Sequence, residues 1–282
     1  MPTFAAPDGT QLAYHSVGEG EPLICLPGGA MRASAYLGDL GGLASHRRLI
    51  QLDLRGTGGS AAPADPATYR VDRQVADVEA LRAHLGLAQV DLLAHSAAGD
   101  LALLYAAAHP QRVSTLALIT ARARALGVDF TVAHRREAAA LRTSEPWYAG
   151  ARAGFDRIWD GTATDADFDA GTPFFYGRWD AAAQAHAALE VEQANEEASE
   201  IYASDGAFGP PVDLTGLEAP VLVFAGELDG GPRPHVAAEV AKLLPTSELV
   251  VQPGAGHYPW LDDPGFFTRT VTAFLRRAPT SL

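Results

Sequence analysis

Three residues suited to nucleophilic catalysis come at the ends of apolar runs that lie far apart in the sequence. Ser96 follows Val-Asp-Leu-Leu-Ala-His, Asp229 follows Val-Phe-Ala-Gly-Glu-Leu, and His257 lies in Gly-Ala-Gly-His-Tyr-Pro-Trp. A serine hydroxyl attacks a carbonyl carbon when a histidine takes its proton and a carboxylate orients that histidine. The three residues therefore predict acyl-transfer chemistry, with Ser96 as nucleophile, His257 as base and Asp229 as the partner of the base.

Each of these residues also has an ordinary structural explanation. Serine directly before a helix is commonly its N-cap, so Ser96 can cap the helix expected after it. Asp229 can be a turn residue before Gly-Gly, and His257 can be a solvated loop residue. If all three explanations held, it would be a coincidence that the residues occur in the order Ser, Asp, His and that each follows a predicted strand. We therefore favour the catalytic interpretation of the set.

Small residues surround Ser96 and follow another apolar run near the N-terminus. Ala94 and Ala98 occupy the glycine positions of the Gly-x-Ser-x-Gly pattern, in which a sharp turn between strand and helix exposes the serine. Gly29 lies in Leu-Pro-Gly-Gly-Ala, which a plain tight turn would also explain. We predict that the N–H groups of Gly29 and Ala97 form the oxyanion hole.

The elements that would position these residues alternate between short apolar runs and helical patterns. The strands are predicted at 11–16, 22–27, 49–54, 90–95, 113–120, 220–226 and 248–253, and the helices near 34–45 and at 71–86, 97–108, 234–244 and 264–277. Strands separated by helices favour an α/β fold with a mostly parallel, twisted sheet and helices on both faces. The carboxyl ends of parallel strands lie at one edge, where Ser96, Asp229 and His257 are expected to meet.

The interval 122–211 breaks this alternation. Its pattern is mainly helical, it has no convincing buried strand, and it holds twelve of the 23 aromatic residues. We therefore predict a helical cap over 122–211, inserted into a core domain formed by 1–121 and 212–282.

Two features of the cap bear on substrate binding. On a continuous helix, Glu192, Glu196 and Glu200 would form a column, because residues four apart are neighbours. A column facing the site would suit an amino group, although a solvated face of an acidic protein is the simpler interpretation. Glu192, Glu196 and the aromatic Trp179 are the candidate substrate-binding residues, while most cap aromatics would form the cap's own core.

The composition excludes several classes of function. The formal net charge of −13 argues against nucleic acid and anionic membranes as partners and leaves a small-molecule substrate. A single cysteine, Cys25, excludes an intrachain disulfide, and no ligand spacing predicts a metal site. The N-terminus lacks a signal-peptide pattern and no apolar run is long enough to cross a bilayer, so a cytoplasmic protein is expected. The sequence does not indicate an oligomeric state.

As a set, the motifs resemble the α/β-hydrolase superfamily. Within it, Pro-Gly-Gly followed by Asp-Leu-Arg-Gly-Thr-Gly-Gly-Ser is similar to the proline iminopeptidase-like branch, although the usual His-Gly-Gly-Pro-Gly loop reads Pro-Gly-Gly-Ala-Met here. The resemblance implies an α/β-hydrolase fold and no cofactor. The matching segments are DGTQLAY (8–14), LPGGA (26–30), DLRGTGGS (53–60), AHSAAG (94–99), AHPQRV (108–113), GELD (226–229) and GAGHYPW (254–260).

These observations predict a serine hydrolase that transfers an acyl group to water from a small ester or an N-terminal, prolyl-type amide. Two alternatives stay open. The scaffold can serve a biosynthetic pathway as a thioesterase, lactonase, C–C hydrolase or lyase. It can also be a catalytically inactive binding protein, for which Ala94 and Ala98 are the best support. Serine at the nucleophile position argues against a dehalogenase or an epoxide hydrolase.

Overall fold

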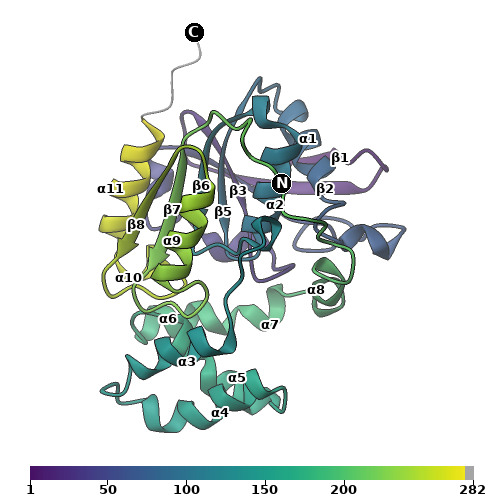
Figure 1. The fold of residues 1–282 in the computed structure, drawn as a ribbon. Helices are drawn as coiled ribbons and strands as arrows, with labels where there is room; N and C mark the ends of the chain where they lie inside the picture. Colours follow the sequence, from purple (N-terminus) through teal and green to yellow (C-terminus); the bar gives the residue numbers. More distant parts are fainter. Residues whose placement is uncertain (277–282) are drawn as a thin grey trace.

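A central eight-stranded sheet organises the chain, whose residues 1–276 are described by a computed structural model. The strand order is β1-β2-β4-β3-β5-β6-β7-β8 (Figure 1). β2 runs antiparallel to both of its neighbours, and the pairs from β4 to β8 are parallel. The strands are β1 Thr3–Ala5, β2 Gln11–Val17, β3 Pro22–Leu26, β4 Arg48–Leu52, β5 Val90–His95, β6 Val113–Ile119, β7 Val221–Gly226 and β8 Ser247–Gln252.

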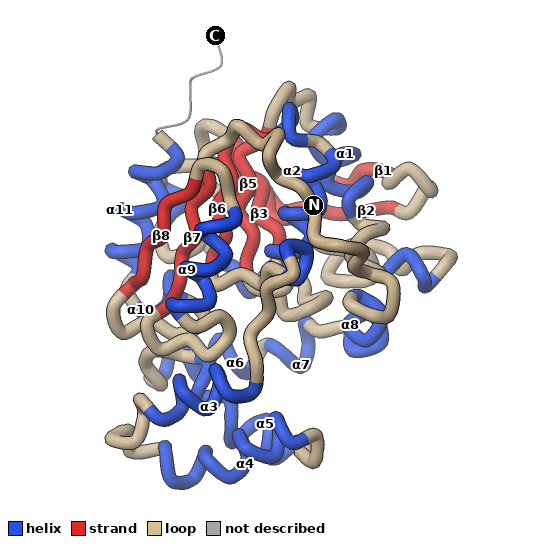
Figure 2. Tube along the Cα trace, viewed as in Figure 1, coloured by secondary structure: helices blue, strands red, loops and turns tan. Residues whose placement is uncertain are grey.

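Helices cover both faces of this sheet, as Figure 2 shows. One face packs against α1 (Val75–His84), α2 (Ala98–Ala108) and α9 (Pro234–Leu243). The other packs against α10 (Pro259–Asp262) and α11 (Pro264–Leu275). The 3-10 helices are η1 Ser34–Leu37, η2 Leu43–Ser45, η3 Pro66–Tyr69, η4 Pro110–Arg112, η5 Arg124–Leu126 and η6 Thr172–Phe175.

Alternating side chains explain why the strands read as continuous apolar runs. In β3, Ile24 and Leu26 join the apolar cluster on one face, whereas Leu23 and Cys25 join the cluster on the other. Both sets are buried because helices cover both faces of a parallel sheet. The predicted α/β fold is confirmed.

Helices and turns, and no strand, fill the described chain between β6 and β7. They lie beyond the carboxyl ends of the central strands (Figure 1). Part of this region has a small core of its own, in which Trp147, Tyr148 and Trp159 pack on Phe155 and Phe174. The boundaries at 122 and 211 remain a prediction, and 277–282 of the predicted core domain lie outside the described residues. The helices are α3 Val132–Ala140, α4 Tyr148–Asp160, α5 Asp165–Gly171, α6 Ala181–Ala188, α7 Glu190–Gln193 and α8 Glu196–Tyr202.

No helix within residues 1–276 is long and apolar enough to cross a membrane.

Candidate active site

Ser96 occupies a sharp turn between β5 and α2. Its φ is +54°, in the left-handed region that serine rarely adopts. Its N–H donates to Ile119 O at 3.1 Å, and its carbonyl accepts the N–H groups of Gly99 and Arg122 at 3.0 and 2.9 Å. The N-cap of α2 is Ala97, and no side chain caps the helix. The N-cap interpretation of Ser96 is therefore wrong, and its hydroxyl is free for another partner.

That partner is His257, which links Ser96 to Asp229 in one chain of hydrogen bonds. His257 Nε2 lies 2.8 Å from Ser96 Oγ, and His257 Nδ1 lies 2.8 Å from Asp229 Oδ2. Because a carboxylate only accepts hydrogen bonds, the imidazole proton belongs on Nδ1, and Nε2 is left to accept the serine proton. The structure thus brings together the three residues predicted as nucleophile, base and partner.

Two glycines near Ser96 allow the close packing that the turn requires. A Cβ on Gly28 would lie 2.6 Å from both Ser96 Cβ and His95 O, and a Cβ on Gly99 would lie 2.4 Å from Arg122 O. A Cβ would therefore clash with backbone at Gly99, one residue beyond Ala98. This explains why alanine is tolerated at position 98 while glycine is needed next to it.

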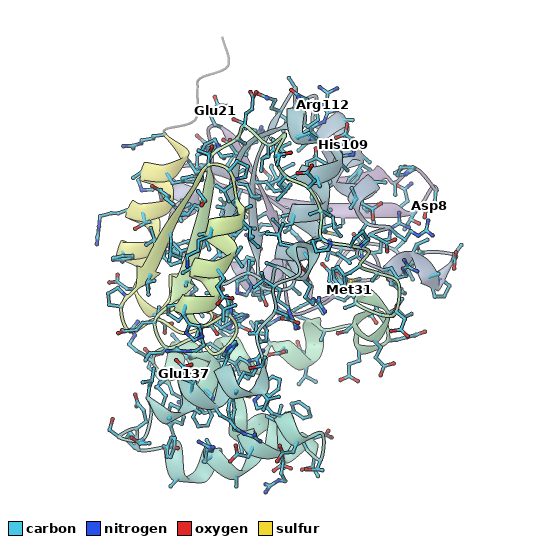
Figure 3. All side chains as sticks on the ribbon, in the orientation of Figure 1. Asp8, Glu21, Met31, His109, Arg112 and Glu137 are labelled. Atoms are coloured by element: carbon cyan, nitrogen blue, oxygen red, sulfur yellow. The ribbon has the colours of Figure 1, made fainter. Side chains whose placement is uncertain are left out.

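The Asp229 side chain is fixed by its own loop. Its Oδ1 accepts the N–H of Gly231 at 2.8 Å, and the side chain is 1% exposed. Arg233 Nη1 donates to the carbonyls of Asp229 at 3.0 Å and Glu227 at 2.7 Å. Arg233 also pairs with Glu137 of α3 at 3.1 Å, and Figure 3 labels Glu137. The loop that carries Asp229 is thus joined to α3, the first α-helix after β6.

The backbone of His257 is held from three sides. Its carbonyl accepts hydrogen bonds from Thr120 Oγ1 and His95 Nε2, both at 2.9 Å. Its N–H donates to Phe175 O, in the helical region after β6, at 2.7 Å. A Cβ on Gly256 would lie 2.6 Å from Phe175 O, so the two segments meet at backbone distance. The segment containing Phe175 therefore helps to place the base.

A buried relay joins the loop of Gly28 to the loop of His257. Gly28 N–H donates to Tyr36 Oη at 2.6 Å, and Tyr36 Oη lies 2.7 Å from His95 Nδ1. His95 Nε2–H donates to the carbonyl of His257, so Nδ1 must accept the Tyr36 proton. Burial holds the pKa of His95 well below its usual range, which keeps the ring neutral and this tautomer fixed.

We expect Tyr36→Phe to weaken both stability and turnover. The change leaves a buried N–H on Gly28 and a buried Nδ1 on His95 without partners, which costs about 1–3 kcal/mol of unfolding free energy. Displacement of the Gly28 loop should lower kcat by roughly 10- to 100-fold. Urea unfolding and ester kinetics measure the two effects. Tyr14→Phe, whose hydroxyl makes only a 3.5 Å contact with His84, is the control. Unchanged stability and kcat in Tyr36→Phe would show that the relay has no role.

The two predicted oxyanion donors have free N–H groups. Among residues 1–276, no acceptor is bonded to the N–H of Gly29 or of Ala97. Both residues adjoin the Ser96 turn, Ala97 as its next residue and Gly29 as the neighbour of Gly28, which packs on Ser96. The first turn of α2 adds a favourable dipole for negative charge at this point. Their role in an oxyanion hole remains a prediction.

The predicted glutamate column does not form. α7 ends at Gln193 and α8 begins at Glu196, with extended backbone at Ala194 and Asn195 between them. Asn195 caps α8 by accepting the N–H of Ala198 at 3.0 Å, which starts a new helix. Glu192 and Glu196 therefore lie on different helices, and both are exposed.

Trp179 is half-buried and packs against the apolar cluster on the sheet face that α10 and α11 cover. Its ring contacts Tyr176 with centroids 5.2 Å apart. No contact joins Trp179 to Ser96, His257 or Asp229 within the described residues. A part for Trp179, Glu192 or Glu196 in substrate binding stays a prediction.

Sequence reasoning also missed His186, a buried histidine of α6. Its Nε2–H donates to Tyr36 O at 3.1 Å, and its Nδ1 lies 2.8 Å from Tyr176 Oη. Burial, together with the charge of Arg32, lowers the pKa of His186 to about 4. An unfolded histidine titrates near 6.5, so the unfolded state binds more protons between these values. Stability contributed by neutral His186 is therefore present at neutral pH and lost as the pH falls from about 6.5 towards about 4.

We expect His186→Gln to flatten this pH dependence. The wild type should lose about 3 kcal/mol of unfolding free energy through this group between pH 7 and pH 4, in addition to the loss from His95. His186→Gln should be less stable at pH 7 and show a smaller change on acidification. Urea unfolding at several pH values measures the slope, and exposed His46→Gln is the control. Equal slopes in wild type and His186→Gln would contradict this assignment.

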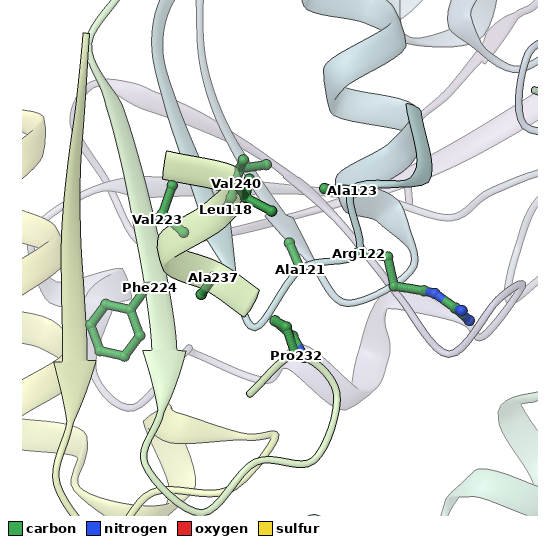
Figure 4. A pocket seen from close by; sticks show the side chains of 9 residues that line it. All are labelled: Leu118, Ala121, Arg122, Ala123, Val223, Phe224, Pro232, Ala237 and Val240. Carbon is green, nitrogen blue, oxygen red and sulfur yellow. The ribbon is translucent and has the colours of Figure 1, made fainter. Parts of the chain in front are cut away.

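A small, largely apolar cavity lies beside the site, between α9 and the ends of β6 and β7 (Figure 4). None of Ser96, Asp229 and His257 lines it, so we do not assign it to the acyl group. In residues 1–276, no group of three or more metal-binding side chains is placed to hold a metal ion. The cavity is lined by Leu118, Ala121, Arg122, Ala123, Val223, Phe224, Pro232, Ala237 and Val240.

The sequence of this chain is similar to known proteins of one fold family. A family model described as alpha/beta hydrolase fold matches residues 21–264. The protein named "Putative 2-succinyl-6-hydroxy-2,4-cyclohexadiene-1-carboxylate synthase" from Bacillus subtilis (strain 168) is 27% identical, over 95% of this chain and 96% of the relative. The proline iminopeptidase of Lactobacillus helveticus (strain DPC 4571) is 38% identical, but over only 39% of this chain and 40% of the relative.

A solved structure adds a match along nearly the whole chain. The esterase from Rhodococcus sp. ECU1013 superposes with a TM-score of 0.69 and 27% identity, covering 99% of each chain. The family match spans most of the chain, and the iminopeptidase match supports the resemblance to that branch. The chain therefore belongs to the α/β-hydrolase family and is an enzyme of that family.

Proposed function

We propose that the chain is a serine hydrolase in which Ser96, His257 and Asp229 act as a catalytic triad. The observation that carries this proposal is the continuous hydrogen-bond chain from Ser96 Oγ through both nitrogens of His257 to Asp229, at 2.8 Å in each step. His257 takes the hydroxyl proton while Ser96 Oγ attacks the carbonyl carbon. Asp229 holds the imidazole tautomer and stabilises the imidazolium that forms.

The negative oxygen of the tetrahedral intermediate is held by the N–H groups of Gly29 and Ala97. Both N–H groups are unpartnered in the described residues; Ala97 directly follows Ser96, and Gly29 follows Gly28, which packs on Ser96, and these positions support this role. His257 then gives its proton to the leaving group, and the acyl group stays on Ser96. Water deprotonated by His257 attacks the acyl-enzyme and releases the acid.

The substrate class that we propose is a small ester. A solved esterase matches 99% of each chain at 27% identity, and a solved proline iminopeptidase from Mycobacterium smegmatis matches 98% of each chain at 25% identity with a TM-score of 0.73, so overall similarity supports both substrate classes. In the cap, the glutamate column was the feature that would suit the amino group of an N-terminal amide, and that column does not form. Release of an N-terminal residue is the second candidate, supported by the 38% local identity to the iminopeptidase.

A labelling experiment and two substrates test this proposal. A fluorophosphonate probe reacts only with an activated serine, so wild type should be labelled at Ser96. We expect hydrolysis of para-nitrophenyl butyrate and little turnover of proline para-nitroanilide. The reverse preference would support the second candidate. An unlabelled protein that hydrolyses neither compound would contradict the proposed serine hydrolase.

A further inference from the structure

Arg135 in α3 is a cation without an acidic partner. In residues 1–276, its guanidinium forms no ion pair and donates no hydrogen bond. Three other arginines in this region are all paired: Arg122 with Asp129 at 2.8 Å, Arg136 with Asp160 at 2.6 Å, and Arg233 with Glu137 at 3.1 Å. In a chain of net charge −13, carboxylates are plentiful, so one arginine left unpaired among paired neighbours is a distinct feature.

Aromatic rings surround this guanidinium instead. Its carbon lies 3.8 Å from the ring centre of Trp159, 4.6 Å from that of Phe130 and 5.5 Å from that of Phe175. Ring faces attract a cation but do not accept the in-plane N–H donors of guanidinium. Burial lowers the pKa of Arg135 to about 10, so the group is cationic at neutral pH while several of its donors lack an acceptor.

Arg135 lies close to residues that contact Asp229 and His257. A Cβ on Gly231 would lie 2.9 Å from Arg135 Nη2, and the N–H of Gly231 donates to Asp229 Oδ1. On the other side, the ring of Phe175 lies 6.4 Å from that of His257, centre to centre. A single residue therefore lies between Arg135 and each of these groups: Gly231 on the side of Asp229, and Phe175 on the side of His257.

Arg135 forms no ion pair with Asp229, whose charge acts on it only from a longer distance. Both oxygens of that carboxylate already have partners, Oδ1 in Gly231 N–H and Oδ2 in His257 Nδ1, and Arg135 lies beyond ion-pair distance. A partly buried cation without a partner is costly, and a ligand anion would offset that cost. A planar guanidinium fork matches a carboxylate, which accepts two N–H groups at once.

We propose that Arg135 binds a carboxylate of the substrate, so that the enzyme acts on small esters that carry a free carboxylate. This inference rests on the proposed ester hydrolysis and specifies its substrate. The negative charge of the protein as a whole repels anions, so a local cation beside the site is what an anionic substrate requires. The same cation disfavours the charged amino group of a peptide N-terminus.

Matched ester pairs test the role of Arg135. The first pair is para-carboxyphenyl butyrate and its neutral isostere para-carbamoylphenyl butyrate, with the charge on the leaving group. The second pair is the para-nitrophenyl monoester of adipic acid and para-nitrophenyl hexanoate, with the charge on the acyl group. The variants are Arg135→Gln, Arg135→Lys, which keeps the charge, and Arg136→Gln as the control on the same helix.

We expect Arg135→Gln to lower kcat/KM for the anionic member of at least one pair by roughly tenfold or more, with less than a roughly twofold change for its neutral member. Arg135→Lys should retain part of the preference, and Arg136→Gln should change neither pair. Equal losses for both members of each pair, no loss at all, or a wild type that hydrolyses only the neutral esters would overturn the inference.

Binding of adipate, measured by calorimetry, separates this inference from the proposed reaction. Adipate should bind wild type roughly tenfold more tightly than Arg135→Gln. A protein that hydrolyses no ester but binds adipate through Arg135 would contradict the proposed function and keep the carboxylate site. A protein that hydrolyses neutral esters and binds adipate equally in both forms would keep the function and remove the site.

Discussion

Replacing Ser96 with alanine is expected to lower kcat on para-nitrophenyl butyrate by roughly four to six orders of magnitude. Alanine has no oxygen to attack the carbonyl, so no acyl-enzyme forms, and the remaining rate comes from binding and oxyanion stabilisation. The Cβ of alanine fills the same place as that of serine, and the turn already carries small residues on both sides. KM should therefore change little while kcat falls.

Two measurements make this result specific to the hydroxyl. Fluorophosphonate labelling should disappear in Ser96→Ala, and urea unfolding should show a stability close to that of wild type. Ser16→Ala, at an exposed position of β2, is the control and should retain full activity. A Ser96→Ala protein that kept more than about 1% of wild-type kcat would exclude Ser96 as the nucleophile.

Much of the fold could be predicted because helices cover both faces of the sheet, so its parallel strands appear in the sequence as continuous apolar runs. β5 begins and ends at the predicted residues 90 and 95, and the other strands of the parallel sheet agree to within two residues. β1 was missed because its three residues bury only Phe4, which produces no apolar run. The single helical stretch predicted near 34–45 is two short 3-10 helices, separated by residues with positive φ at Gly38, Leu40 and Gly42.

The chain order of the catalytic residues could also be predicted, because each follows a strand and strand ends share an edge. The residues that hold the catalytic side chains in place could not be predicted from the sequence. Tyr36 and His95 are 59 residues apart, and nothing local in the sequence indicates that one donates to the other. Phe175 holds the N–H of His257 through its backbone carbonyl, and a backbone contact leaves no signal in the residue type. Asn195, by contrast, does carry a local signal. Asparagine is a preferred N-cap, so Asn195 before Glu-Glu indicates the start of a new helix, and the four-residue spacing of the glutamates led us to predict one continuous helix instead.

Replacing Asp229 with asparagine is the second change with a very large expected effect, because the loop dictates how the amide must turn. Gly231 N–H donates to Oδ1, so the amide oxygen of asparagine stays on that side and its NH2 group faces His257. An NH2 group donates, so Nδ1 of His257 must accept, and the proton moves to Nε2. In that tautomer Nε2 has no lone pair for the Ser96 proton, and the base is disabled. We expect kcat to fall by roughly 10⁴-fold.

This tautomer argument predicts more than a loss of rate. KM should change little, since Asp229 is buried behind His257 and its volume is kept in asparagine. Asp229→Ala, which leaves Nδ1 without any imposed donor, should be no less active than Asp229→Asn despite the larger change in structure. Steady-state kinetics of both variants, beside exposed Asp205→Asn as the control, decide the point. An Asp229→Asn enzyme within about tenfold of wild type would mean that Asp229 does not set the tautomer of His257, and a different acid would then have to orient the base.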